Sequence, residues 1–447
     1  MDDAGLELLG ASVFLRGNRI EAIGPATTLP GTADEVIDAR GHLVLPGFVN
    51  THHHMFQSLT RAVPAVQDAE LFTWLRGLYP IWARLTPEMI RVSTQVAMAE
   101  LLLSGCTTTS DHLYLFPNGC RLDDSIDGAR LAGMRFTATR GAMSVGQSAG
   151  GLPPDEVVER EPTILADMER VVSRYHDPSP GAMLQIALAP CSPFSVSREL
   201  MRDTALLARS RGVRLHTHLA ENDHDIAYSQ EHFGRTPAQY AEELGWLGAD
   251  VWHAHCVKLD KPGRACFAAT GTGVAHCPSS NMRLASGIAP VRAMLDAGVP
   301  VGLGVDGSAS NDAAHMVAEA RLAMLLQRVG IAAEPFGCDR GPGAMTVRDA
   351  LRMATRGGAQ VLGRSDIGQL APGLCADLAL FDLAALGFAG GAVHDPVGAL
   401  LLCAPAQAAY TIVGGVVRVR AGRLESFELA PVLRRHDALA RALVSHV

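Results

Sequence analysis

Lysine is almost missing from this sequence. Of the 38 lysine and arginine residues in the 447-residue chain, only Lys258 and Lys261 are lysines. Whatever its origin, this scarcity excludes every mechanism that needs a lysine elsewhere in the chain.

Other features are absent as well. There is no block of basic residues, and the formal net charge of −8 argues against a nucleic-acid surface. No apolar run approaches the roughly 18 residues that cross a membrane. The nine cysteines form no CxxC pair, and the first residues lack the basic region of a signal peptide. We therefore expect a cytoplasmic protein that binds neither nucleic acid nor membrane.

What remains is an apolar globular chain. Hydrophobic residues make up 48% of the sequence, and 45 residues are glycine. A chain of this length can hold a (β/α)8 barrel with a satellite domain as well as two or three ordinary domains. Composition alone does not choose between them.

The two ends of the chain share one pattern. Residues 11–15, 19–23 and 35–38 read as short antiparallel strands, with a turn at Gly17 and Asn18. The same texture returns at 376–382 and 410–417. We expect residues 1–42 and 366–430 to form one small β-sandwich domain, followed by a C-terminal helix over 431–447.

Between the ends, apolar runs rich in β-branched residues alternate with helical stretches. Thr86 and Pro87 mark the start of one helix, as N-cap and first helical residue, and Gly105 marks its end. Eight such runs predict an α/β fold, a (β/α)8 barrel (TIM barrel) over 43–365 with its catalytic residues where strands end. The eight runs are 43–50, 107–113, 134–139, 183–189, 213–218, 251–255, 273–276 and 301–305.

Histidine and acidic residues gather at four of these strand ends. The first run leads into three consecutive histidines, of which His52 and His54 share one face of an extended chain and His53 points the other way. The other three ends are 216–221 (HTHLAE), 253–256 (HAHC) and 305–307 (VDG). Imidazoles and a carboxylate suit Zn²⁺ or Fe²⁺ and leave room for a water.

Two of these ends carry a His-x-His pair. The later residue of each pair lies nearer the mouth of the barrel, so we choose His218 and His255 for the site. We expect His216 and His253 to be hydrogen-bonded residues of the inner barrel layers. His53 should point away from the site, toward core packing or toward the residues that surround the metal ligands.

Taken together, these motifs resemble those of the amidohydrolase superfamily, in its branch of aminohydrolases that act on purines, pterins and triazines. The resemblance spans essentially the whole chain. It rests on residues 46–54, 216–221, 255–256 and 302–308, and further on 68–72, 140–147, 189–195 and 276–287.

The resemblance implies a set of roles. His52, His54, His218 and Asp306 would bind the metal, and Glu221, His255 and Asp306 would move protons. Some members hold two metals bridged by a carbamylated lysine at the end of strand four, but the fourth run here contains no lysine. We therefore expect one divalent ion per subunit, with zinc expected ahead of iron, in a homo-oligomer.

The implied reaction is the hydrolytic deamination of an oxidised purine, in which 8-oxoguanine and water give urate and ammonia. A divalent metal lowers the pKa of its bound water from about 15.7 toward 7. The resulting hydroxide would attack the carbon that carries the amine. Glu221 would protonate the adjacent ring nitrogen, Asp306 would accept the proton from water, and His255 would polarise the hydroxide or shuttle its proton.

Other readings remain open. Isoxanthopterin, guanine or a hydroxy-s-triazine could replace 8-oxoguanine, since each carries a leaving amine between two ring nitrogens. A non-catalytic scaffold is a remote alternative, and hydrolysis of a cyclic imide would ordinarily need the missing lysine. No basic cluster fits a phosphate, so a free base is favoured over a nucleotide.

Substrate contacts are read less directly. Gln57 could meet the carbonyl and N–H edge of an oxidised purine or merely cap a helix. The aromatic residues Trp74, Trp82 and Tyr114 could stack on a flat ring or pack in the core. Cys191 could line the pocket or simply be buried, and Arg140 could contact a ring carbonyl or form a salt bridge.

Overall fold

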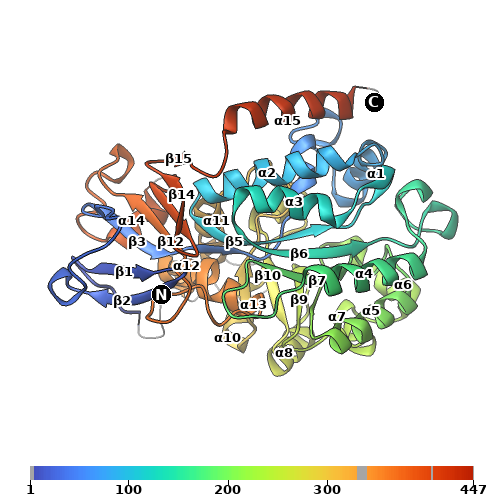
Figure 1. Cartoon of the computed structure of the whole chain (residues 1–447). Coiled ribbons are helices and arrows are strands. Elements are labelled where there is room, and N and C mark those ends of the chain that lie inside the picture. The colour runs from blue at the N-terminus through green and yellow to red at the C-terminus, as the bar shows by residue number, and fades with distance from the viewer. Residues whose placement is uncertain (1–4, 330–339, 404–405, 446–447) are drawn as a thin grey trace.

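A closed barrel of eight parallel strands forms the centre of the molecule (Figure 1). The computed structural model describes residues 5–329, 340–403 and 406–445. The strands follow chain order around the barrel, and β11 pairs with β4 to close it. They are β4 (Phe48–Asn50), β5 (Cys106–Leu113), β6 (Arg135–Ala142), β7 (Leu184–Pro190), β8 (Arg214–Leu219), β9 (Val251–His255), β10 (Gly273–His276) and β11 (Val301–Leu303). The predicted (β/α)8 barrel is confirmed.

Helices surround the barrel. Those in the first half are α1 (Leu71–Trp82), α2 (Pro87–Leu103), α3 (Leu122–Ala132), α4 (Glu161–Tyr175), α5 (Arg198–Arg211), α6 (Asp223–Phe233) and α7 (Pro237–Glu243). Those that follow are α8 (Lys261–Thr270), α9 (Pro278–Arg283), α10 (Val291–Ala297), α11 (Met316–Val329), α12 (Val347–Arg352), α13 (Gly358–Val361), α14 (Pro396–Leu402) and α15 (Leu429–Val444). Within the described ranges, none of them combines the length and apolar character needed to span a bilayer.

Helix α2 begins and ends as its sequence predicts. The Thr86 hydroxyl accepts a hydrogen bond from the backbone N–H of Met89, which would otherwise lack a partner in the first turn. Pro87 occupies the first helical position, and the chain leaves the helix at Gly105 with φ +89°.

Both chain ends contribute strands to two antiparallel sheets outside the barrel. Strands β1 (Ser12–Arg16) and β2 (Arg19–Gly24) form one sheet. The other runs in the order β15 (Arg423–Leu424), β14 (Val416–Arg420), β13 (Tyr410–Val413), β12 (Leu378–Asp382) and β3 (His42–Pro46). Ile20, Leu380 and Ile412 belong to the apolar layer between the two sheets. The expected strand at 35–38 is not formed.

The run at 43–50, expected as one strand, is two strands. Strand β3 pairs with β12 in the five-stranded sheet, whereas β4 pairs with β5 and β11 in the barrel. The break lies at Gly47, where a Cβ atom would stand 2.1 Å from the Thr107 hydroxyl oxygen. The chain changes sheets at a point where only glycine lets the neighbouring strand approach so closely.

The C-terminal helix α15 lies along α2 on the outside of the barrel (Figure 1). His436 of α15 hydrogen-bonds the Ser58 hydroxyl at 3.0 Å, and Arg435 forms an ion pair with Glu88 at 2.6 Å. The helix therefore reaches the short turn Met55–Thr60 that follows the first barrel strand.

Candidate active site

A cavity opens at the carboxyl end of the barrel. Its walls come from segments that follow different strands: His54 after β4, Tyr114 after β5, Cys191 after β7 and Asp306 after β11. Because all eight strands are parallel, their carboxyl ends meet at one face, and side chains far apart in sequence converge there.

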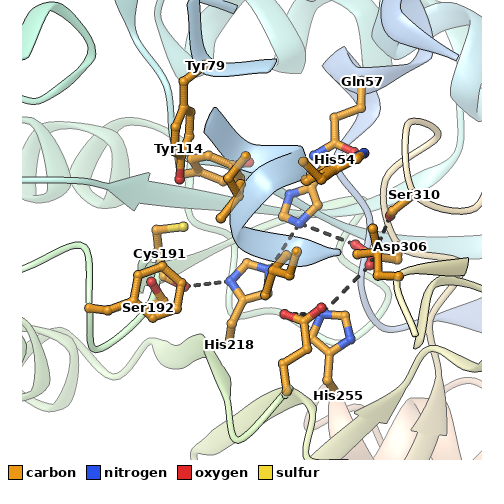
Figure 2. Close-up of a pocket in the computed structure, with 16 residues that line it drawn as sticks. His54, Gln57, Tyr79, Tyr114, Cys191, Ser192, His218, His255, Asp306 and Ser310 are labelled. Atoms are coloured by element: carbon orange, nitrogen blue, oxygen red, sulfur yellow. Dashed lines mark hydrogen bonds and ion pairs between the residues drawn. The ribbon is translucent and has the colours of Figure 1, made fainter. Parts of the chain in front are cut away.

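Three imidazoles and one carboxylate converge beside this cavity. The Nε2 atoms of His52 and His54 lie 3.2 and 3.3 Å from Asp306 Oδ1. The Nε2 atoms of His54 and His218 lie 3.1 Å apart. All four side chains are buried. Figure 2 shows His54, His218 and Asp306 facing one another across this point.

Each imidazole is oriented by its other ring nitrogen. His54 Nδ1 donates to the His112 carbonyl at 2.7 Å, and His218 Nδ1 donates to the Cys191 carbonyl at 2.5 Å. These bonds place the N–H on Nδ1 and leave the Nε2 lone pairs directed at the convergence point. Burial lowers the pKa of both rings, that of His218 to about 3, so they are neutral at pH 7.

His52 follows the same rule through a relay. His216 Nδ1 donates to the Trp252 carbonyl at 3.0 Å, so its Nε2 must accept, and His52 Nδ1 lies 2.8 Å from it. His52 Nε2 is left fully buried, without a well-formed hydrogen bond to any described residue. Buried polar atoms without partners are rare. Three lone pairs and an ionised carboxylate fit a divalent ion such as Zn²⁺ or Fe²⁺.

His112 on β5 also stands in this cluster, and no sequence pattern singled it out. One ring nitrogen of His112 and one each of His52, His54 and His218 all lie within 4.8 Å of one another. Its ring stacks on His218, and its Nε2 lies 2.8 Å from the Ala189 carbonyl oxygen. Strand β5 reads CTTTSDHL, and one histidine among so many polar residues gives no periodic signal.

Glu221 and His255 stand next to Asp306. His255 Nε2 lies 3.6 Å from Glu221 Oε2 and 3.7 Å from Asp306 Oδ2, and its Nδ1 donates to Asn281 Oδ1 at 2.8 Å. His255 and Asp306 both adopt left-handed backbone conformations, with φ of 70° and 61°. Non-glycine residues are strained there, and such strain concentrates at functional sites.

The environment drives the pKa values of these neighbours apart. Burial raises the pKa of Glu221 to about 8, and the carboxylates of Asp225 and Asp306 add to the rise although His255 opposes it. Burial also works against the charged forms of Asp306 and His255. At Asp306 the surrounding imidazoles outweigh it and hold the pKa well below its usual range. At His255 the carboxylates outweigh it and raise the pKa. Glu221 thus keeps a proton beside an ionised Asp306.

The residues expected to contact substrate divide into two groups. Gln57, Trp74, Tyr114 and Cys191 all line the cavity. Gln57 Oε1 is buried and lacks a hydrogen bond to any described residue. The Gln57 side chain packs against Gly307, and a Cβ atom added to Gly307 would lie 1.8 Å from Gln57 Oε1.

Arg140 and Trp82 are not part of the cavity wall. Arg140 pairs with Asp167 at 2.7 Å and with Glu159 at 2.8 Å, so of the two roles left open for it the structure shows the salt bridge. Trp82 is a core residue whose indole N–H donates to the Thr60 hydroxyl at 3.1 Å.

The remaining histidines of the motifs are engaged elsewhere. His253 hydrogen-bonds the Trp246 carbonyl at 2.9 Å. His53 Nδ1 accepts a hydrogen bond from the backbone N–H of His54 at 2.8 Å. Tyr79 and Ser310 line the cavity without having been predicted. Ser310 lies four residues after Asp306 and donates to its Oδ2 at 3.3 Å. Tyr79 belongs to the apolar side of α1, where its sequence resembles ordinary core.

The chain is similar to a known family and to proteins of known structure. The family model "Amidohydrolase family" matches residues 43–418. An 8-oxoguanine deaminase from Pseudomonas aeruginosa is 50% identical over 99% of this chain and 96% of its own. An isoxanthopterin deaminase from an unknown prokaryotic organism is 41% identical over 87% and 82%. The crystal structure of an atrazine chlorohydrolase from Arthrobacter aurescens TC1, complexed with zinc, superposes with a TM-score of 0.90 at 33% identity, covering 98% of this chain and 97% of its own.

Proposed function

Because this chain belongs to the amidohydrolase family, we propose that it is a metal-dependent aminohydrolase that converts 8-oxoguanine and water to urate and ammonia. One observation carries the proposal: a buried, proton-holding Glu221 lies beside a donor set for one metal ion, at the wall of a pocket. The 50% identity to an 8-oxoguanine deaminase supports the choice of substrate.

We assign the metal to His52, His54, His218 and Asp306. When bound, a divalent ion lowers the pKa of a coordinated water from about 15.7 toward 7 and so supplies a nucleophile at neutral pH. We expect a single ion, because β7 contains no lysine and both lysines of the chain come after β9. The zinc in the related atrazine chlorohydrolase supports zinc here, with iron as the alternative.

The proton transfers are assigned from the pKa order of the site. Asp306 is ionised and accepts a proton from the attacking water. Glu221 enters protonated and donates to the ring nitrogen beside the carbon that carries the amine, so that this carbon can become tetrahedral. The proton of the newly added hydroxyl then passes through Glu221 to the departing nitrogen, the C–N bond breaks to release ammonia, and the proton held by Asp306 returns to Glu221. His255, fixed by Asn281, holds a proton between the two carboxyl groups.

The pocket supports a flat, uncharged heterocycle. Trp74, Tyr114 and Leu284 supply aromatic and apolar wall, and Gln57 Oε1 offers an acceptor to a ring N–H. No arginine or lysine is among the lining residues of the described chain. A nucleotide phosphate would therefore meet no cation inside the cavity, which favours a free base.

Isoxanthopterin is the second candidate substrate, favoured by the 41% identity to an isoxanthopterin deaminase. The test is ammonia release by the purified, metal-loaded protein with 8-oxoguanine, isoxanthopterin, guanine and a hydroxy-s-triazine. We expect the highest kcat/KM with 8-oxoguanine. A preference of about tenfold or more for guanine or isoxanthopterin would overturn the choice, since one lost polar contact is enough to reverse such a ratio.

The same preparation tests the non-catalytic alternative. A scaffold would release no ammonia from any member of the panel and would purify without stoichiometric metal.

The described cysteines are all free thiols, which supports our proposal that the protein works in the reducing cytoplasm.

A further inference from the structure

The proposed mechanism assigns no role to the hydroxyl group of Tyr79. Tyr79 is fully buried, and its hydroxyl oxygen has no hydrogen-bond partner in the part of the chain that the structure describes. It nevertheless lines the cavity. A buried hydroxyl without a partner destabilises a fold, so its presence at a ligand pocket calls for a partner supplied by the ligand.

The neighbouring polar groups do not provide that partner. Figure 2 shows Tyr79 beside Tyr114 and Cys191. The Tyr114 hydroxyl interacts with the amide of Gln57, and the Cys191 thiol with the hydroxyl groups of Ser192 and Ser195. The Tyr79 hydroxyl keeps its proton at neutral pH, because burial holds its pKa well above the usual 10, and it can therefore donate a hydrogen bond.

The ring of Tyr79 is held in place. It precedes Pro80 inside α1 and packs edge-on against Trp82, with ring centroids 5.9 Å apart. Trp82 is itself tied to Thr60 by a hydrogen bond of 3.1 Å. A donor fixed in this way discriminates between ligands, because it cannot turn aside when a ligand lacks the matching acceptor.

Tyr79 lies across the cavity from the reacting groups. In Figure 2, Tyr79, Tyr114 and Cys191 stand on one side, and His255 and Asp306 stand on the opposite side. The carbon that loses its amine must lie beside Asp306, so the far edge of a flat bicyclic ring faces Tyr79. In 8-oxoguanine the far edge carries the oxygen on C8, whereas guanine has only a C–H there.

We propose that Tyr79 is a specificity-determining residue that donates a hydrogen bond to the C8 oxygen of an oxidised purine and thereby selects it over guanine. This assignment rests on the proposed function. Guanine would leave the Tyr79 hydroxyl buried and unpaired in the complex, and a site built to bond a polar group rejects the analogue that lacks it.

The test is Tyr79→Phe, which removes the hydroxyl and keeps the ring. We expect kcat/KM for 8-oxoguanine to fall by roughly 10- to 100-fold, mainly through KM. For guanine, kcat/KM should stay within about twofold of its starting value or rise, because no bond to the hydroxyl is lost. Equilibrium binding of urate and xanthine, which differ by the same oxygen, gives the comparison without turnover.

Tyr240→Phe is the matched control. Tyr240 is also fully buried with a hydroxyl that has no partner among the described residues, but it lies on α7, stacked on Phe233 at 3.9 Å, outside the cavity wall. We expect Tyr240→Phe to leave the ratio of the two substrates unchanged. Thermal unfolding of both variants reports whether either substitution disturbs the fold.

Two results would overturn the assignment: an unchanged kcat/KM of Tyr79→Phe for 8-oxoguanine, or an equal loss with guanine. A wild-type protein that fails to deaminate 8-oxoguanine while it turns over another member of the panel overturns the proposed substrate instead, and the assignment with it. The two failures are therefore distinguished by the wild-type rates.

Discussion

Glu221→Gln is the substitution that most directly tests the proposed chemistry. Glu221 is 4% exposed, and its Oε2 stands 3.6 Å from His255 Nε2. Glutamine has nearly the same shape and can still donate a hydrogen bond, but it cannot release a proton to the ring nitrogen. The substitution therefore removes proton transfer while it preserves packing.

The size of the effect follows from the protonation state. With a pKa of about 8, Glu221 is about 90% protonated at pH 7 and ready to act as an acid. General acid–base assistance is worth roughly 10²- to 10⁴-fold, so we expect kcat to fall by that factor, or about 3–5 kcal/mol of barrier. In the wild-type protein kcat/KM should decline as the pH rises through about 8, because the acid form is lost. The variant should lack this decline.

The assay is steady-state ammonia release, with metal content measured on the same samples. Glu319→Gln is the matched control. Glu319 is also buried, with a pKa raised by burial to about 7, and it is bonded to Ser279 and Asn311 outside the cavity wall. We expect this control to change kcat/KM by less than about tenfold, since it removes no proton from the reaction.

Two outcomes would refute the reasoning. If Glu221→Gln keeps its metal and more than about a tenth of wild-type kcat, Glu221 is not the acid, since general acid catalysis contributes far more than that. If the loss is matched by an equal loss of bound metal, Glu221 acts on the metal centre rather than on the substrate.

Three further predictions concern the pocket, the metal and the scaffold. Gly307→Ala would place a Cβ atom 1.8 Å from Gln57 Oε1, so KM should rise while the metal content stays unchanged. In a Gln57→Ala background the same substitution should raise KM much less, and additive effects of the two substitutions on KM would contradict the contact. Asp306→Asn should abolish both activity and metal binding. A chelator should inactivate the wild-type protein and lower its Tm until Zn²⁺ or Fe²⁺ is restored, whereas full activity of the apoprotein would exclude the proposed metal. Thr86→Ala should lower the free energy of unfolding by about 1 kcal/mol with kcat unchanged, because the Met89 N–H loses its cap; an unaltered stability would show the cap to be dispensable.

Much of the fold was open to prediction because its signals are local. Runs rich in apolar or β-branched residues lie in all eight barrel strands, and Thr86 and Pro87 begin α2 as their chemistry requires. Parallel strands in a closed barrel bring their carboxyl ends to one face, so residues at those ends could be grouped from their positions along the chain. The pairing of His52 with His54 needs only the two-residue repeat of an extended backbone.

Contacts between distant segments decided the rest. The run at 43–50 changes sheets at Gly47 because Thr107 approaches there, and Arg140 turns to Asp167 and Glu159 because α4 and its preceding loop bring carboxylates to it. Tyr79 and His112 carry no pattern that distinguishes them from ordinary buried residues. The periodic pattern of residues along the sequence indicates only which face of a helix or strand a side chain occupies. Which partner it meets on that face, or whether it meets none, depends on how the helices and strands pack in three dimensions.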